Sequence, residues 1–184
     1  MGTRLTKLDN KISKKKTILK FTPLLQEDYG GSKDCTLTSI TAIIFHLLDE
    51  RVEVQDIYDV VEEKAKKYRY SGDKGTSPMF ISRIMNESFE HFKISYKAKS
   101  AYLKNLLKFN YDFIKKEIQA GRPMVLNIFS DGRGCYTNHS VTIVGYAITI
   151  SDEKYLVVYD NWYKSTAYVD YSKLCNISSI NYLC

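Results

Sequence analysis

The chain has 184 residues, enough for one domain with a substantial core and too few for two independent domains. Its composition, 44% hydrophobic and 26% charged with 15 Tyr and 8 Phe, is that of a globular protein and excludes an intrinsically disordered chain. The net charge of +6 comes without an RNA-binding aromatic motif or helix-turn-helix spacing, and the four cysteines are too sparse for a disulfide framework.

The positive charge is concentrated at the beginning of the chain, within residues 1–20. The cations of the first sixteen residues are Arg4, Lys7, Lys11, Lys14, Lys15 and Lys16. We predict a basic arm over 1–20, most simply a solvated tail and less often a segment that contacts an acidic partner, followed by a single domain over 21–184. No segment is long and apolar enough to cross a bilayer, and no apolar block follows the basic arm as in a secretory signal. The compartment stays open: inside the cell, or secreted after removal of a signal segment.

The first strong helical pattern lies over residues 35–49. It follows an extended run over 17–26 and a loop with two glycines that ends at Asp34. Asp34 is suited to cap the helix, because a short side-chain oxygen can accept the first free backbone N–H groups. The apolar residues at helical spacing are Leu37, Ile40, Ile43, Ile44, Leu47 and Leu48. This broad stripe predicts the central helix of the core, with Cys35 as its first residue.

The chain then changes from helices to strands. One helix is predicted over 54–68, and a loop over 71–78 follows it. A second helix is predicted to begin at Ser77 with Pro78 in its first turn, and a third to run from an Asn110 cap to Gly121. A strand is predicted between them, over 91–100. Further strands are predicted over 122–129, 139–150, 154–162 and 166–174. Helices in the first two thirds and antiparallel strands in the last third indicate an α+β fold.

Three residues at the ends of these elements carry reactive chemistry. Cys35 is predicted at a helix N-terminus, where free N–H groups and the helix dipole favour the thiolate. His139 begins a strand and can act as a base, and Asp160 ends the next strand, so the acid can lie beside the base. These residues therefore form a candidate Cys-His-Asp catalytic triad.

Each residue also has a structural interpretation when it is taken separately. A cysteine at a helix start is often a small, buried apolar residue, and a histidine at a strand end is often a polar residue whose hydrogen bonds are made. Asp160, which precedes an asparagine, can simply form a turn. His46 and His91 are assigned to structure. Cys135 and His139 are spaced like a metal pair, but no second pair follows, so neither a metal nor a cofactor is predicted.

The order of the motifs resembles the papain-like cysteine peptidases. The stretch "KDCTLTSITAII" is similar to their nucleophile helix, "NHSVTIVGY" to their histidine strand, and "YLVVYDNW" to the strand whose orienting Asn or Asp precedes a Trp by two residues. "IQAGRPMVLNI" resembles the corresponding segment of a bacterial branch that includes double-glycine leader (bacteriocin-processing) peptidases. The resemblance implies a helical N-terminal part packed on a C-terminal antiparallel sheet.

The region before the cysteine differs from this pattern. The family places a glutamine that binds the oxyanion about six residues before the cysteine, where this chain has Tyr29, and Gln26 lies nine residues before it. The two glycines at 30 and 31 can accommodate a longer loop, so the resemblance implies the oxyanion role for Gln26. Thr36 stands where the leader-peptidase branch has glycine, which argues against that particular substrate.

Three function classes follow from these residues. The first is a cysteine peptidase or amide hydrolase that acts on a peptide or protein through a thioester acyl-enzyme. The second is an acyltransferase or transglutaminase-like enzyme with the same triad and an acceptor other than water. The third is a non-catalytic peptide-binding module, which needs none of the three residues of the candidate triad and is therefore disfavoured.

Overall fold

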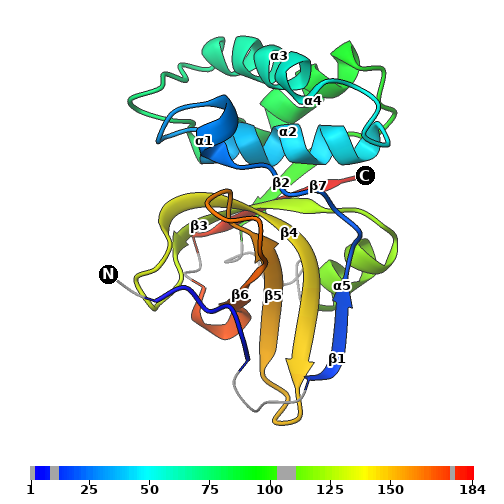
Figure 1. The fold of residues 1–184 in the computed structure, drawn as a ribbon, viewed down its shortest axis with the longest axis vertical. Helices are drawn as coiled ribbons and strands as arrows, with labels where there is room; N and C mark the ends of the chain where they lie inside the picture. The colour runs from blue at the N-terminus through cyan, green and yellow to red at the C-terminus, as the bar shows by residue number, and fades with distance from the viewer. Residues whose placement is uncertain (1–2, 9–12, 103–110, 175–176) are drawn as a thin grey trace.

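The structure of the protein, a computed structural model, describes residues 3–8, 13–102, 111–174 and 177–184. A layer of helices lies against one end of an antiparallel sheet, so the molecule has a helical part and a sheet part (Figure 1). The helices of the first layer precede most of the strands along the chain. This mixture of helices and antiparallel strands confirms the predicted α+β class.

The sheet has seven strands in the order β2-β7-β3-β4-β5-β6, with β1 paired to β4. The strands are β1 (Ser13–Ile18), β2 (Ala98–Tyr102), β3 (Met124–Ser130), β4 (Thr137–Thr149), β5 (Lys154–Tyr159), β6 (Ala167–Asp170) and β7 (Ser179–Leu183). The long strand β4 pairs with β3 in its first half, with β1 in its second half, and with β5 along its other edge. β4 is therefore the strand around which the sheet is organised.

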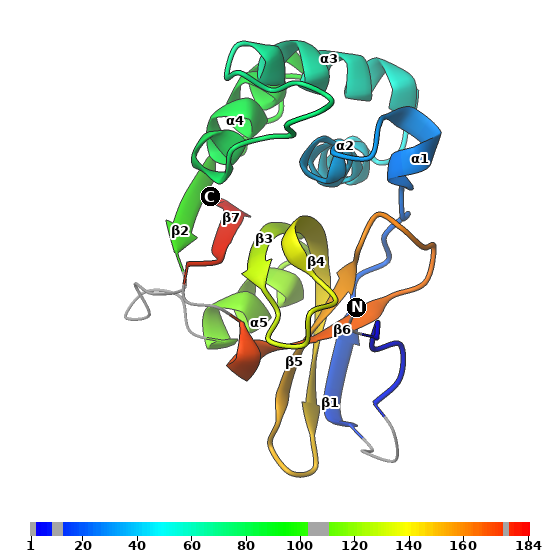
Figure 2. The ribbon, with the colours of Figure 1, turned by 90° about the vertical axis from the view of Figure 1, so that its left-hand side faces the viewer.

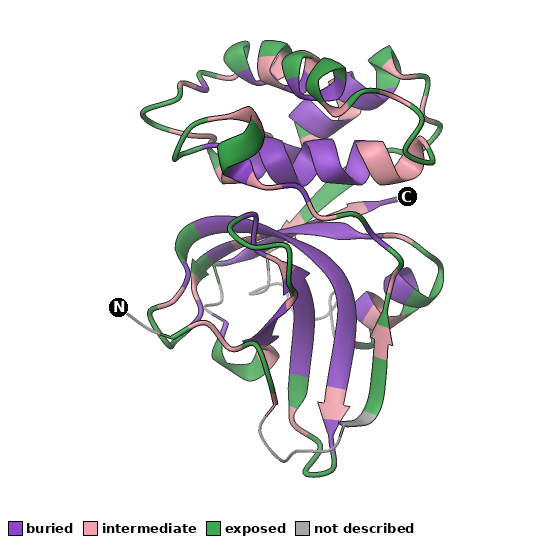
Figure 3. Cartoon of the chain, in the orientation of Figure 1, coloured by how far each residue is buried: buried purple, intermediate pink, exposed green. Residues whose placement is uncertain are grey.

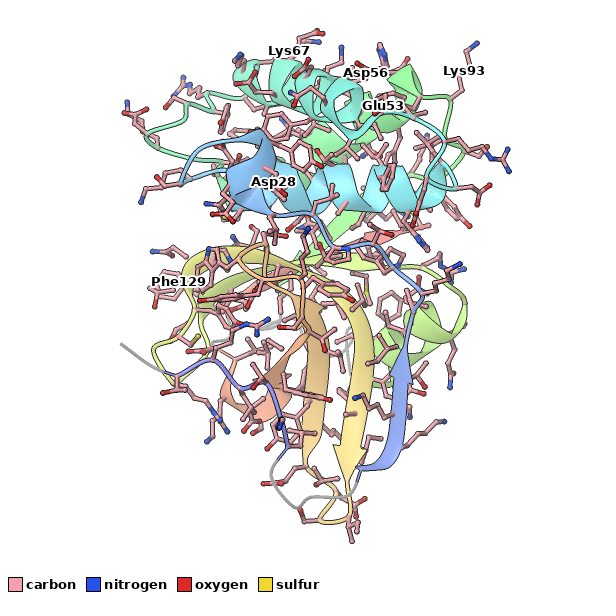
Figure 4. All side chains as sticks on the ribbon, viewed as in Figure 1. Asp28, Glu53, Asp56, Lys67, Lys93 and Phe129 are labelled. Atoms are coloured by element: carbon pink, nitrogen blue, oxygen red, sulfur yellow. The ribbon has the colours of Figure 1, made fainter. Side chains whose placement is uncertain are left out.

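The helical layer contains α1 (Gln26–Tyr29), α2 (Cys35–Leu47), α3 (Val54–Lys66), the 3₁₀ turn η1 (Pro78–Phe80) and α4 (Ile81–His91). α2 lies between the sheet and α3, while α4 lies beside α2 and contacts strand β2 (Figure 2). On the outer face of this layer, charged residues such as Asp56 and Lys67 point away from the sheet (Figure 4). No helix within the described ranges is long and apolar enough to cross a membrane.

Burial explains why α2 takes the central place. All residues from Thr36 to Ile44 are buried, and the helix is almost completely enclosed over this stretch (Figure 3). The predicted stripe that includes Leu37, Ile40 and Ile43 packs against α3 and α4, while Ala42 contacts the sheet side. Burying such apolar side chains stabilises the fold by about 1.5–3 kcal/mol each. The first turn of α2, with Cys35, is thereby fixed against the sheet.

A second core lies within the sheet part, on the side covered by α5 (Tyr111–Gln119). Ile114 and Ile118 of α5 pack against buried residues of β3 and β4 such as Leu126 and Tyr146. A short 3₁₀ turn, η3 (Tyr171–Lys173), follows β6. The sheet is therefore supported independently of the helical layer, and the functional side chains lie where the two parts meet.

The described part of the basic arm is packed against the domain, which differs from a solvated tail. β1 pairs with the second half of β4, and the Tyr168 N–H donates to the Leu5 carbonyl over 2.8 Å. A Cβ atom on Gly145 would collide with the Thr17 carbonyl oxygen, so a glycine in β4 permits β1 to approach. The lysines in "SKKK" occupy a sheet edge, where charged residues are common in natural proteins.

Several local predictions differ from the structure. The predicted strand over 91–100 begins at Ala98, because His91 ends α4. Pro78 starts a 3₁₀ turn that leads into α4, and the Ser77 side chain makes no capping bond. Strand β7 was not predicted from the sequence, and the predicted cap at Asn110 lies outside the described residues.

Candidate active site

Cys35 is the first residue of α2 and lies against strand β4 of the sheet. The first N–H groups of a helix have no acceptor within the helix, so this position favours a negative sulfur. The Ser140 N–H in β4 donates to the Cys35 Sγ over 3.4 Å. The thiol is partly exposed, so a substrate can reach a sulfur that the backbone already stabilises.

The net effect of the surroundings is to lower the pKa of the Cys35 thiol. Burial raises this pKa, but the hydrogen bond with His139 and the charge of that residue lower it, as do the Ser140 N–H and the Thr36 side chain. The thiolate is the nucleophilic form of cysteine. Cys35 and His139, more than a hundred residues apart in the sequence, thus interact directly.

The ring of His139 is oriented by the main chain of Asp160. The His139 Nε2 lies 2.8 Å from the Asp160 carbonyl oxygen, and this nitrogen donates because a carbonyl oxygen can only accept. Nδ1 is then the nitrogen that remains for the hydrogen bond with Cys35. His139 is buried, with 5% of its surface exposed, so its ring has few alternative partners.

Two aromatic side chains pack against the His139 imidazole. The Trp162 ring stacks on the His139 ring with centroids 4.2 Å apart, and the Tyr136 ring lies 5.7 Å from it in a nearly parallel plane. Trp162 and Tyr136 also contact each other, with centroids 5.6 Å apart. This aromatic cluster limits rotation of the His139 ring.

The Asp160 carboxylate has other partners. It accepts hydrogen bonds from the Tyr136 hydroxyl at 2.9 Å and from the N–H groups of Trp162 and Tyr163, each at 3.3 Å, and it forms an ion pair with Arg4. Asp160 was predicted beside His139 and lies there. Among the described contacts, however, the residue reaches the imidazole through its main-chain carbonyl rather than its carboxylate.

Gln26 opens α1 and lines a cleft of about 730 Å³, whose wall also contains Asn161, the residue that binds the Cys35 carbonyl. The cleft is bounded by the loop that contains Gly30 and Gly31, and on the other side by Trp162 and Tyr163. The Gln26 N–H donates to the Asn161 carbonyl over 2.9 Å, which joins α1 to the loop after β5. Among the described residues, the buried Gln26 Oε1 has no hydrogen-bond partner.

Asp34 does not cap α2 with its side chain, which corrects the sequence-based prediction. Its buried carboxylate accepts instead from the hydroxyls of Tyr58, at 2.9 Å, and Tyr70, and from the Gly31 N–H. A Cβ atom on Gly30 would collide with Tyr58 and Asp34. The loop before Cys35 is therefore folded around the Asp34 carboxylate. Position 30, where the loop passes closest to Tyr58 and Asp34, requires glycine.

The comparisons with known proteins identify a family and a fold. Residues 18–183 match the model of the Peptidase_C39 like family. The chain belongs to that family. Among solved structures it is similar to the proform of Amb a 11, a cysteine protease and major ragweed pollen allergen, with a TM-score of 0.50, 15% identity, and coverage of 97% of this chain and 70% of that one. The search of curated proteins gave no match.

Membership of the Peptidase_C39 like family supports a cysteine-peptidase type of function, and the structural likeness supports a papain-like fold. A helix that begins at Cys35 and packs on an antiparallel sheet, expected from the sequence, is the arrangement observed. The narrower relation to the bacteriocin-processing branch stays a prediction.

Asn161 is a site residue of this Peptidase_C39 like protein that sequence reasoning missed. Its Nδ2 lies 2.9 Å from the Cys35 carbonyl oxygen, 2.9 Å from the Ser39 Oγ and 3.0 Å from the Ser140 carbonyl oxygen. Its backbone is left-handed, with φ 64°, which asparagine tolerates better than most residues. The only sequence signal was an asparagine directly after Asp160, and it was interpreted as part of a turn.

Cys135, His46 and His91 lie in other environments. Burial, together with the charges of Asp131 and Asp160, raises the pKa of the half-buried Cys135 thiol. The His46 ring packs on Phe21, and the His91 ring on Phe92. Within the described residues no three His, Cys, Asp or Glu side chains gather in a way that could hold a metal ion.

Proposed function

We propose that the protein is a cysteine peptidase or amide hydrolase that works through a thioester acyl-enzyme. The observation that carries the proposal is the geometry around the two residues: the Cys35 sulfur accepts from the N–H of Ser140, the residue after His139, and the Asp160 carbonyl holds the His139 ring. This pairing gives a nucleophile with a lowered pKa and a base of fixed orientation, the two requirements of thiol catalysis. A peptide or protein is the substrate class that fits the family.

In the first half of the reaction His139 Nδ1 holds the proton that the Cys35 thiol has given up. The thiolate attacks the carbonyl carbon of the scissile amide and forms a C–S bond, while the carbonyl π electrons move to the oxygen. The oxyanion then collapses and the C–N bond breaks. The amine leaves with the proton from Nδ1, and a thioester remains on Cys35.

In the second half His139 Nδ1 takes a proton from water, and the resulting hydroxide attacks the thioester carbon. The C–S bond breaks, the carboxylic acid leaves, and the thiolate and imidazolium pair is restored. The Asp160 carbonyl remains the acceptor of Nε2–H in both halves. Trp162 and Tyr136 keep the ring plane, so Nδ1 points at the sulfur throughout.

Gln26 and the Cys35 N–H are the proposed donors to the oxyanion. Gln26 shares the wall of the cleft with Asn161, which binds the Cys35 carbonyl, and the Cys35 N–H belongs to the free first turn of α2. Loss of one such donor typically lowers kcat by about 100-fold to 1000-fold. Gln26→Ala should therefore reduce turnover by this factor with an unchanged melting temperature, and full activity of that variant would remove Gln26 from the mechanism.

The test combines a peptide-library digest with thiol labelling. The library includes double-glycine sequences and is incubated with the parent protein, Cys35→Ala and His139→Ala, and products are identified by mass spectrometry. Hydrolysis by the parent alone supports the proposal. Products joined to an added amine, without hydrolysis, identify an acyltransferase instead.

Labelling with iodoacetamide at mildly acidic pH tests the nucleophile without a substrate. Cys35 should react before Cys135, because the pKa of the first thiol is lowered and that of the second is raised. His139→Ala should remove this selectivity. Equal labelling of both thiols in the parent would favour a binding module with no catalysis.

A further inference from the structure

We propose that Arg4, in the basic arm, is a positioning residue of this active site: it fixes the loop after β5 that orients His139. The inference rests on the proposed function, because positioning matters only where Cys35 and His139 react. Neither the family match, which begins at residue 18, nor the sequence pattern points to Arg4.

The loop over residues 160–165 supplies most of the contacts that organise the site. It contains the Asp160 carbonyl that accepts from His139, the Asn161 amide that joins Cys35 to β4, and the Trp162 ring that stacks on His139. Such a loop, between β5 and β6, is not held by a regular strand ladder. Its conformation depends on single contacts, such as the bond from the Gln26 N–H to the Asn161 carbonyl and the side chains that bind Asp160.

All three nitrogen atoms of the Arg4 guanidinium bind this loop. Nε pairs with the Asp160 carboxylate, Nη1 donates to the Ser165 Oγ over 3.1 Å, and Nη2 donates to the Ser165 carbonyl. The guanidinium carbon also lies 4.7 Å from the centre of the Tyr163 ring. One side chain thus connects the first, fourth and sixth residues of the loop, which a lysine, with a single point of charge, cannot do.

The ion pair is enclosed. The Asp160 side chain is 0% exposed and that of Arg4 13% exposed. A buried carboxylate without a cation carries a large desolvation cost, and loss of one partner of such a pair displaces or destabilises the other. Without Arg4 the Asp160 carboxylate would move toward solvent or another donor, and its carbonyl, on the same residue, would move with it.

The arm is held over the loop by a second contact. The Tyr168 N–H in β6 donates to the Leu5 carbonyl over 2.8 Å, and Leu5 and Leu8 pack against the apolar cluster under β5 and β6. Lys7 lies on the same arm and is exposed. Lys7→Met is therefore a matched control, since it removes one arm charge without touching the site.

The experiment compares the parent, Arg4→Met, Arg4→Lys and Lys7→Met in the full chain. Trp162 is the only tryptophan, so its fluorescence reports the position of the loop without any substrate. The second readout is the rate of Cys35 alkylation by iodoacetamide as a function of pH. The third is the kcat and KM for a peptide found in the library digest.

Arg4→Met should change the Trp162 emission and lower both the alkylation rate at mildly acidic pH and kcat, the latter by about 10-fold to 100-fold, as expected for misplacement of a catalytic group. KM should change less. The alkylation rate and kcat of Arg4→Lys should fall between those of the parent and Arg4→Met. Ethylguanidinium added to Arg4→Met should restore part of its alkylation rate and kcat. Lys7→Met should match the parent.

Three results would overturn the proposal. Parental emission and alkylation in Arg4→Met would mean that Arg4 is dispensable, and a higher kcat would mean that the arm restrains the enzyme. An unfolded Arg4→Met combined with a folded Arg4→Lys of full activity would reduce the role to charge compensation in folding. Failure of the proposed function itself is separate, because it appears as unselective labelling of Cys35 in the parent.

Discussion

Two buried aspartates flank the candidate site, one in each part of the molecule. Asp34, in the helical part, precedes Cys35, and Asp160, in the sheet part, contacts His139. Both carboxylates accept from tyrosine hydroxyls and backbone N–H groups, yet only Asp160 has an ion-pair partner among the described residues, namely Arg4. The helical part thus holds its loop with neutral donors, and the sheet part requires a cation from a distant segment.

The difference shows how two sides of one site can be stabilised by separate means. The nucleophile side is fixed by local sequence, because Gly31, Asp34 and Cys35 lie within five residues and Tyr58 and Tyr70 come from the same helical layer. The base side is assembled from segments at opposite ends of the chain. Substitutions at the two carboxylates should therefore have unequal consequences.

The largest effect is expected for Asp160→Ala, which leaves the enclosed Arg4 without its counter-ion. Removal of one partner from a buried pair generally destabilises by about 3–5 kcal/mol. Urea unfolding measures the loss, and Asp112→Ala, at an exposed ion pair with Lys115, is the control and should change little. Equal stability of the two variants would show that the buried pair contributes nothing.

Asp34→Ala should have a smaller effect on stability. It leaves the Tyr58 and Tyr70 hydroxyls and the Gly31 N–H without their acceptor, and an unsatisfied buried group typically costs about 1–3 kcal/mol. Asp160→Ala likewise removes the acceptor of three neutral donors, the Tyr136 hydroxyl and the Trp162 and Tyr163 N–H groups, and leaves a buried cation in addition, so the cost of Asp34→Ala should be the smaller one in the same urea experiment. The opposite order would contradict the contrast between the two parts.

Gly30→Ala tests the packing of the loop around the Asp34 carboxylate. Its new Cβ would collide with Tyr58 and Asp34, and overpacking of this kind costs about 1–3 kcal/mol. Gly121→Ala is a useful comparison, because nothing lies close to a Cβ there, although its φ of 76° also disfavours alanine. If the Gly30 variant melts at the parental temperature, the loop has more room than the structure shows.

The smallest effect is expected for Tyr58→Phe, which removes one of two hydroxyl donors to Asp34. Burial and the neighbouring carboxylate raise the pKa of Tyr58, so the group is a neutral donor at physiological pH. Loss of one hydrogen bond should destabilise by about 1 kcal/mol. Tyr70→Phe should behave alike, and the double variant should lose more than the sum, since each hydroxyl can partly compensate for the other.

The same contrast explains what the sequence could and could not predict. Cys35 could be placed because its helix has a strong apolar period and a loop rich in glycine before it. His139 and Asp160 could be placed near strand ends by β-branched runs and turn residues, and the structure has His139 as the third residue of β4 and Asp160 directly after β5. Local patterns thus located the three residues of the candidate triad.

The contacts between distant segments could not be predicted in the same way. Arg4 lies among six cations in a stretch whose composition resembles a solvated tail, and its partner is 156 residues away. The bond from the Asp160 carbonyl, rather than the carboxylate, depends on the backbone direction of a loop in which Asn161 is left-handed. Neither of these contacts produces a periodic pattern in the sequence.

Strand β7 occupies an interior place in the sheet although it comes last along the described chain. It pairs with β2 on one edge and with β3 on the other. During synthesis β2 and β3 therefore lack their common partner until Ser179–Leu183 have left the ribosome. A nascent chain that stalls earlier exposes two unpaired strand edges, so premature translation arrest should give aggregates rather than a shortened active enzyme.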